Sequence, residues 1–207
     1  MRLRQDVSVL PDALTQLAKN KIMLDFCETL RYDQMIVFSD EGNLFNRHAV
    51  SECDQRKEPR EKPEGLWFSF GQAWAMYLLD ERESWAKLRL NHVTHIYELD
   101  IDYKNVLEID NIRQFNEFES KFAIKDNYKV DWSKVAKNYM GVKIKMQPKK
   151  TCRGDDKYYS PWYWNWDISS GCIWDRSAIR DIRLLMAFQP LWKLLNTEEA
   201  SGLPGLV

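Results

Sequence analysis

Hydrophobic and polar residues alternate in several short segments of the chain. Residues 95–102 place an apolar side chain at nearly every second position, and residues 105–110 and 141–146 repeat this pattern. A period of two directs successive side chains to opposite faces of an extended strand. Residues 35–38 and 65–69 are short apolar runs next to polar or charged stretches. We predict strands at all of these segments, with the alternating ones half-buried and antiparallel.

Other segments space their apolar residues as helices do. A stripe that includes Trp74 and Trp85 runs through residues 72–90 and predicts a helix whose apolar side faces the core. The same spacing predicts helices over 112–122, 132–139 and 176–195, and one or two short helices over 11–30.

Charged and polar segments separate these elements. Residues 47–64 are rich in charge and contain Pro59 and Pro63, which is typical of a surface loop, and a lysine-rich loop is predicted at 147–157. Strands and helices do not alternate one for one, and no glycine-rich phosphate turn occurs. The pattern therefore favours an antiparallel α+β domain over a doubly wound sheet.

The most unusual segment is 158–175, which holds four of the nine tryptophans. Trp162, Trp164 and Trp166 alternate with other residues, so we predict an extended segment with three indoles on one face. Indoles combine a flat apolar surface with one N–H donor, which suits a pocket wall and a core strand equally. The carboxylate of Asp167 in these surroundings caps a backbone group, pairs with a charge or takes part in chemistry.

The composition narrows the range of partners. The 207 residues carry 30 basic and 31 acidic side chains, so no global field attracts nucleic acid or an acidic membrane. The N-terminus lacks the apolar run of a signal peptide, and no segment is apolar enough to span a bilayer. We expect a cytoplasmic protein with a single domain over 1–207, a helical segment at 1–34 and a loose tail at 196–207.

Residues that commonly bind metals form no recognisable motif. The four cysteines are widely spaced, without a Cys-x-x-Cys pair, and are interpreted as free thiols of a reducing compartment. His92 and His95 lie at the entry to a predicted strand, where a surface position is expected. We predict no metal site.

The order of several motifs supports a resemblance to a known superfamily. Residues 65–69, Gly-Leu-Trp-Phe-Ser, precede a helix with Ala-Trp-Ala at 73–75, and alternating strands follow. Residues 166–175, Trp-Asp-Ile-Ser-Ser-Gly-Cys-Ile-Trp-Asp, complete the order. Together they resemble ADP-ribosyltransferase domains of the bacterial-toxin kind, and small phage and bacterial proteins tied to defence and toxin systems. The resemblance implies an α+β fold of split antiparallel sheets with flanking helices.

The resemblance also implies a cleft that binds NAD as a substrate. In that superfamily a strand that ends in an aromatic residue and a Ser or Thr forms one wall of the nicotinamide pocket. On this sequence the wall corresponds to Trp67, Phe68 and Ser69. Trp166 would supply a second aromatic face for stacking and for excluding water.

Two positions depart from the superfamily's pattern. The usual Arg or His of the first strand is replaced by Ser39, with Arg47 and His48 as alternatives on the following loop. The usual catalytic glutamate is missing, and Asp167 is the first choice for the acid, with Asp175 as the second. A carboxylate near the ribose favours the positively charged transition state of nicotinamide–ribose cleavage. Either one of these aspartates supplies the acid, or the domain has lost transfer activity.

The leading interpretation is a mono-ADP-ribosyltransferase that acts as an intracellular toxin or anti-phage effector. Its acceptor would be a macromolecule, either a protein side chain or a nucleic-acid base, and an antitoxin would be a further partner. Two other functions stay open. One is a non-catalytic module that binds a ligand or partner on the same fold, and the other is an NAD glycohydrolase.

Overall fold

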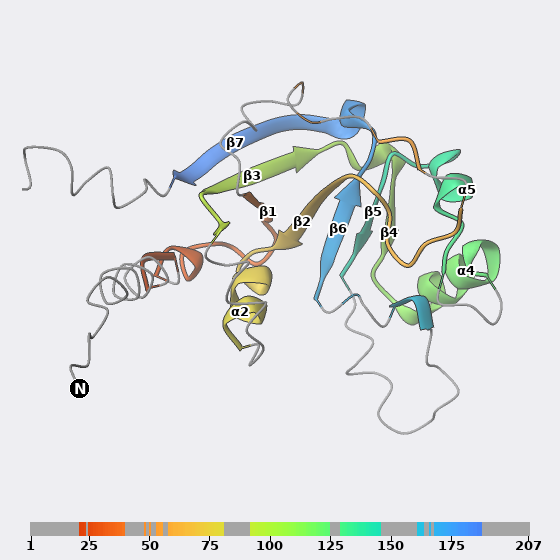
Figure 1. Ribbon diagram of the computed structural model, residues 1–207, viewed down its shortest axis with the longest axis horizontal. Helices are drawn as coiled ribbons and strands as arrows, with labels where there is room; N and C mark the ends of the chain where they lie inside the picture. The colour runs from red at the N-terminus through yellow and green to blue at the C-terminus, as the bar shows by residue number, and fades with distance from the viewer. Residues whose placement is uncertain are drawn as a thin grey trace, which may run out of the picture.

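The computed structural model describes residues 21–23, 25–39, 48, 50, 53–55, 58–80, 92–124, 129–145, 161–163, 166 and 168–187. In this part of the chain seven strands form one sheet in the order β4-β5-β6-β2-β1-β3-β7 (Figure 1). The strands are β1 (Met35–Ser39), β2 (Leu66–Phe70), β3 (His95–Ile101), β4 (Val106–Ile109), β5 (Gly141–Ile144), β6 (Ser170–Ile173) and β7 (Ile179–Ala187).

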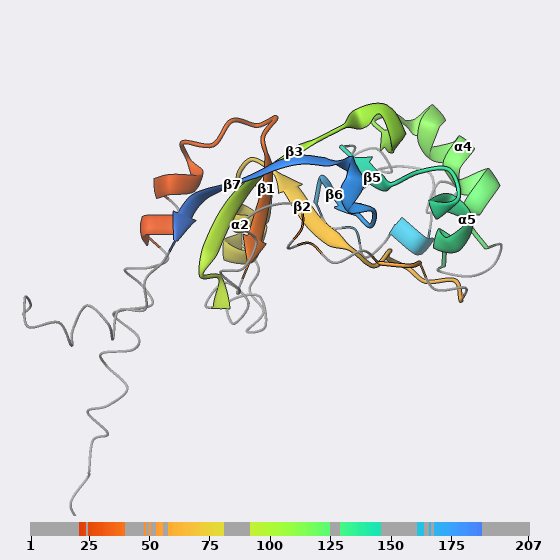
Figure 2. The same cartoon turned by 90° about the horizontal axis from the view of Figure 1, so that it is seen from above.

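Short helices pack beside this sheet. They are α2 (Ala73–Asp80), α4 (Ile112–Phe122) and α5 (Trp132–Ala136), with 3-10 turns at Tyr103–Asn105, Pro161–Tyr163 and Arg176–Ala178. Helices α4 and α5 lie together at the β4 and β5 end of the molecule, whereas α2 lies below β2 (Figures 1 and 2). Side-chain caps fix the starts of α4 and α5, because Asn111 and Asp131 each accept a hydrogen bond from a backbone N–H of the first turn.

The pairing within the sheet is antiparallel except between β4 and β5, which run parallel. Parallel neighbours need a long crossover, and here the segment that contains α4 and α5 supplies it. The architecture is α+β, as predicted. The expectation of split antiparallel sheets is not met in this detail, because β2 bonds to both β1 and β6 and joins all seven strands.

The two faces of the sheet bury different sets of side chains. One face carries a single core cluster that includes Phe68, Tyr97 and Leu99. The other face carries two clusters, one against α4 and α5 with Trp132 at its centre, and one beside α2 with Ile36. This second face is therefore divided into two clusters, of which the one against α4 and α5 is the richer in buried aromatic side chains.

Most predicted elements are confirmed. Strands lie at all five predicted segments, and α4 spans the predicted residues 112–122. The helix predicted over 132–139 ends at Ala136, and the predicted helix over 72–90 is described from Ala73 to Asp80. The predicted surface loop at 47–64 is partly packed, because Arg60 forms a β-bridge with Val130. No helix in the described ranges is long and apolar enough to cross a membrane.

The closing helix predicted over 176–195 is wrong, because residues 179–187 form strand β7. The register shifts between Asp100 and Ile101, whose partners are Asp181 and Ile179, so Arg180 is an extra residue in β7. Such a bulge brings Ile179 and Ile182 onto the same buried face although they are three residues apart. A spacing of three is also the helical signal, which explains the error.

Candidate functional site

The predicted pocket residues on β2 divide between the two faces of the sheet. Trp67 lies opposite Cys172 and Ser69 lies opposite Ser170, and side chains two positions apart on a strand share a face. Phe68 projects to the other face, where it packs edge-to-face against Phe70 in the core. Trp67 and Ser69 therefore form one surface, and Phe68 supports it from behind.

Trp166 completes an aromatic wall beside Trp67. The two ring centroids are 4.9 Å apart, and Tyr163 stacks on Trp166 at 6.0 Å with an interplanar angle of 7°. The predicted extended segment is wrong here, because residues 161–163 form a 3-10 turn. The backbone N–H of Trp166 donates to the Tyr163 carbonyl at 2.9 Å. Trp162 and Trp166 still share a cluster, because a turn brings residues four apart together. Trp164 lies outside the described residues.

Three buried polar atoms of this face have no hydrogen-bond partner in the described part of the chain. They are Ser69 Oγ and the indole Nε1 atoms of Trp162 and Trp166. Two neighbouring indoles differ, because Trp132 Nε1 donates to the Arg60 carbonyl at 3.1 Å and Trp174 Nε1 donates to the Tyr139 carbonyl at 2.8 Å. Buried polar groups are nearly always paired, so unpaired donors indicate where a ligand or water oxygen would bind.

The other predicted site residues do not join this surface. Ser39 ends β1 opposite His95, and alternation places it on the same face as Val37, away from Ser69. Asp175 caps a 3-10 turn and accepts hydrogen bonds from the Ser177 N–H at 2.8 Å and the Ser177 hydroxyl at 2.6 Å. That capping role accounts for the position of its carboxylate without any chemistry. Asp167 and Arg47 lie outside the described residues.

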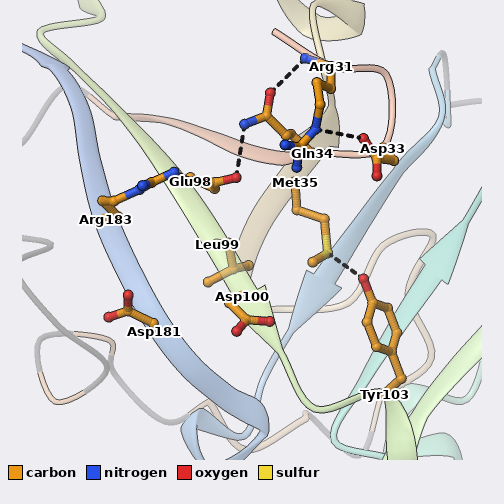
Figure 3. Close-up of a pocket in the computed structure, with 10 residues that line it drawn as sticks. All are labelled: Arg31, Asp33, Gln34, Met35, Glu98, Leu99, Asp100, Tyr103, Asp181 and Arg183. Carbon is orange, nitrogen blue, oxygen red and sulfur yellow. Dashed lines mark hydrogen bonds and ion pairs between the residues drawn. The ribbon is translucent and has the colours of Figure 1, made fainter.

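A polar pocket opens at the start of β1, with a volume of about 420 Å³. None of the predicted site residues lines it. Its upper part is a chain of hydrogen bonds that runs from the Arg31 N–H through the Gln34 side chain to Glu98, which also pairs with Arg183 (Figure 3). The Gln34 hydrogen bond, followed by the Arg183 guanidinium, holds the pKa of Glu98 below its ordinary value.

Two acidic residues of this pocket are visible in the sequence, but the alternating pattern of their strand gives them an ordinary explanation. Glu98 and Asp100 occupy the polar positions of an alternating strand, which is normal for a solvated face. Their cross-strand neighbours, Arg183 and Asp181, belong to β7, a segment predicted as a helix. The cross-strand neighbours could not be found until the strand was known.

A second charged group lies on β4 and β5. Lys143 is buried and forms an ion pair with Glu108, and its Nζ lies 4.4 Å from the centre of the Tyr103 ring. Burial, with the neighbouring Glu108 carboxylate, raises the pKa of Asp110. Since Glu108 satisfies the buried ammonium, this group is a paired structural element.

The described residues contain no group of three or more His, Cys, Asp or Glu side chains that could hold a metal ion. Comparison with protein-family models, curated proteins and solved structures finds no match to this chain.

Proposed function

We propose that the protein is a mono-ADP-ribosyltransferase that binds NAD against Trp67, Trp166 and Ser69. The observation that carries the proposal is the buried Ser69 hydroxyl, which has no partner in the described part of the chain and lies on the same face as two contacting indoles. The order of the sequence motifs indicates the class of reaction. The aromatic wall is a surface on which the flat nicotinamide ring could stack.

The reaction would break the bond between nicotinamide and ribose. Nicotinamide leaves with the bonding electron pair, the acceptor nucleophile forms a bond to the same ribose carbon, and the acceptor loses a proton. Positive charge develops on the ribose in the transition state, which a carboxylate stabilises. Aromatic walls favour transfer over hydrolysis because they exclude water.

Asp167 is the proposed acid, since it follows Trp166 directly in the sequence. Asp175 is the less favoured choice, because its carboxylate already accepts two hydrogen bonds from Ser177. The acceptor is proposed to be a protein or a nucleic acid, and a role as an intracellular toxin or defence effector follows from the resemblance alone.

The test is incubation of the protein with NAD labelled in its adenylate part and a cell lysate. We expect label to appear on protein or nucleic acid. Asp167→Asn should remove at least about 90% of it, because the variant lacks the negative charge that stabilises the transition state. Asp54→Asn, an exposed charge with no assigned role, is the matched control. If the wild type labels nothing and leaves NAD intact, the proposal fails and a binding module is favoured. Free ADP-ribose without a labelled acceptor would also overturn transfer and indicate a glycohydrolase.

Ser69 provides a separate test of where NAD binds. Because its hydroxyl has no partner in the described residues, Ser69→Ala should leave thermal stability nearly unchanged while raising the KM for NAD several-fold. Ser120→Ala on the exposed side of α4 is the control for a hydroxyl away from the wall. An unchanged KM in Ser69→Ala would place the NAD site elsewhere.

A further inference from the structure

The two edge strands of the sheet differ in length. The strand order places β4 at one edge and β7 at the other, so each pairs with a single neighbour in the described part of the chain (Figure 1). Strand β4 has four residues, whereas β7 has nine. An edge strand presents a row of backbone N–H and C=O groups to which a further strand can bond. The longer of the two edges is therefore the one on β7.

The middle of β7 is regular and exposed. Its register with β3 is continuous from Asp181 to Leu184, and the shifts lie on either side of this stretch. Arg180, Asp181, Arg183 and Leu184 are exposed, whereas Ile182 packs into the core. Leu184 has 52% of its surface exposed although it is apolar. This segment has the form that pairing with a further strand requires.

The charges on this segment are complementary to themselves. Charged side chains commonly protect an edge strand from pairing, and charges of one sign would repel a second copy. Asp181 and Arg183 have opposite signs and share one face of the strand, since they are two positions apart. If two copies of β7 pair antiparallel about a two-fold axis at Ile182, Asp181 of each copy lies opposite Arg183 of the other. The interface then holds two equivalent ion pairs.

The same charges exclude neighbouring registers. An axis at Asp181 would place two aspartates opposite each other, and an axis at Arg183 would place two arginines opposite each other. An axis between two residues would put the core face of one copy beside the polar face of the other. In the register centred on Ile182, Leu184 lies opposite Arg180, whose aliphatic stem can cover it.

Contacts within one chain favour this arrangement. Arg183 pairs with Glu98, and 65% of its side chain is exposed, so its guanidinium has room for a second carboxylate (Figure 3). Asp181 lies opposite Asp100 on β3. Like charges at opposite positions destabilise a sheet, and a guanidinium from a second copy would offset this contact.

We propose that the protein forms a dimer by antiparallel pairing of β7 with β7 of a second copy, with the two-fold axis at Ile182. The two sheets would join into one continuous sheet across this axis. The aromatic wall on β2 is separated from β7 by β1 and β3, so it lies outside the interface. The proposal goes beyond the proposed transfer of ADP-ribose and does not depend on it.

Sedimentation velocity at increasing protein concentration tests the proposal. We expect the average mass to rise from one chain to two between about 1 and 500 μM, because a single strand pair forms a small, reversible interface. Added NaCl should weaken the dimer, since salt screens exposed ion pairs. A protein that stays monomeric would overturn the proposal, and a strand of another protein would then be the alternative occupant. Growth beyond a dimer would also overturn it, because two-fold pairing closes at two copies.

Two charge variants locate the interface. Asp181→Arg should weaken dimerisation by at least about tenfold, because it sets two guanidinium groups opposite each other. Within its own chain the new guanidinium faces Asp100, so the melting temperature should not fall. This readout separates loss of the interface from loss of folding. Asp181→Arg combined with Arg183→Asp exchanges the two charges and should restore the dimer, because opposite signs face each other again.

Glu117→Arg is the matched control, because it reverses an exposed acidic charge on α4. It should form the dimer as the wild type does. A dimer that persists unchanged in Asp181→Arg would place the interface elsewhere on the molecule. A double variant that folds and remains monomeric would exclude the register centred on Ile182. Either result would overturn the proposal.

Discussion

At the scale of single residues, four indoles in one aromatic cluster differ only in what their N–H groups contact. Trp132, Trp162, Trp166 and Trp174 are each at most 4% exposed. Two of them donate to backbone carbonyls, and two have no acceptor among the described residues. The difference separates two indoles that hold backbone carbonyls from two whose buried N–H groups have no acceptor among the described residues.

The first prediction compares Trp→Phe substitutions at these positions. Trp132→Phe and Trp174→Phe should lower the free energy of unfolding by about 1–3 kcal/mol more than Trp162→Phe and Trp166→Phe do. The reason is that a lost donor leaves the Arg60 or Tyr139 carbonyl unpaired, whereas truncation of an unpaired indole removes an unsatisfied group. Urea unfolding followed by circular dichroism measures each value. The same atoms are removed in every variant, so equal losses would show that all four N–H groups are paired.

The second prediction concerns Glu98 and pH. Its folded pKa is held below the ordinary 4.5 by the Gln34 hydrogen bond and then by Arg183. A carboxyl group whose pKa is lower in the folded than in the unfolded protein contributes its full stabilisation at pH values above the unfolded pKa. This contribution is lost as the pH falls through the folded pKa. We expect the free energy of unfolding to decrease below about pH 4.5, and protonation of Glu98 to account for part of this decrease.

Comparison with Glu98→Gln isolates that component, because the amide does not titrate. The difference in unfolding free energy between wild type and variant should shrink as the pH is lowered from 6 to 3. Glu117→Gln serves as the control, since it should leave the pH profile unchanged. A difference that stays constant over this range would contradict the prediction.

At the scale of elements, the sequence predicted strands and helices wherever local periodicity and burial agree. Strand β3 alternates from Tyr97 to Ile101, because Tyr97, Leu99 and Ile101 pack into one core cluster. Helix α4 was predicted at its full extent because its apolar spacing coincides with an Asn111 cap. In both elements the apolar residues of the sequence have the same spacing as the side chains that pack into the core.

The elements that were predicted incorrectly are those whose buried side chains depart from the regular spacing of their secondary structure. The bulge at Arg180 gives β7 a helical spacing of buried residues, and the turn at 161–163 gives neighbouring tryptophans a spacing of four. The candidate site was affected in the same way. Trp67, Ser69 and Trp166 gather on one face, whereas Ser39 and Phe68 lie on the other face, because a one-residue change of position reverses the face of a strand.

The third prediction tests the closest contact between elements, where β6 passes between β2 and β5. A Cβ added at Gly171 would lie 2.3 Å from Phe68 Cζ and 2.5 Å from the Val142 carbonyl oxygen. Gly171→Ala should therefore lower the free energy of unfolding by about 1–3 kcal/mol or more, measured in urea. Adding Phe68→Leu should recover only part of this loss, because the carbonyl belongs to the neighbouring strand and cannot move aside. Full recovery would show that the ring alone causes the clash.

At the scale of the whole molecule, β2 connects the two halves of the sheet. It bonds to β1 on one side and to β6 on the other, so the clusters beside α2 and beside α4 and α5 share one hydrogen-bonded strand. The proposed NAD wall lies on β2 itself. Loss of pairing in either half would then disturb the position of Trp67 and Ser69.

The fourth prediction follows from this connection, and two buried thiols report on it. Cys27 belongs to the cluster beside α2, and Cys172 to the cluster beside α4 and α5, and both are fully buried. Burial raises the pKa of Cys27 to about 11 and also raises that of Cys172, so neither forms the reactive thiolate while folded. If β2 makes the sheet one cooperative unit, both thiols should become reactive at the same urea concentration.

Alkylation with N-ethylmaleimide at increasing urea, followed by mass spectrometry of the separate peptides, measures this for each thiol. Coincident midpoints mean that the NAD wall is lost only when the whole sheet unfolds. Labelling of Cys27 at lower urea than Cys172 would show instead that the half beside α2 opens first. The wall beside Trp166 would then persist without β1, and a ligand bound there would protect Cys172 more than Cys27.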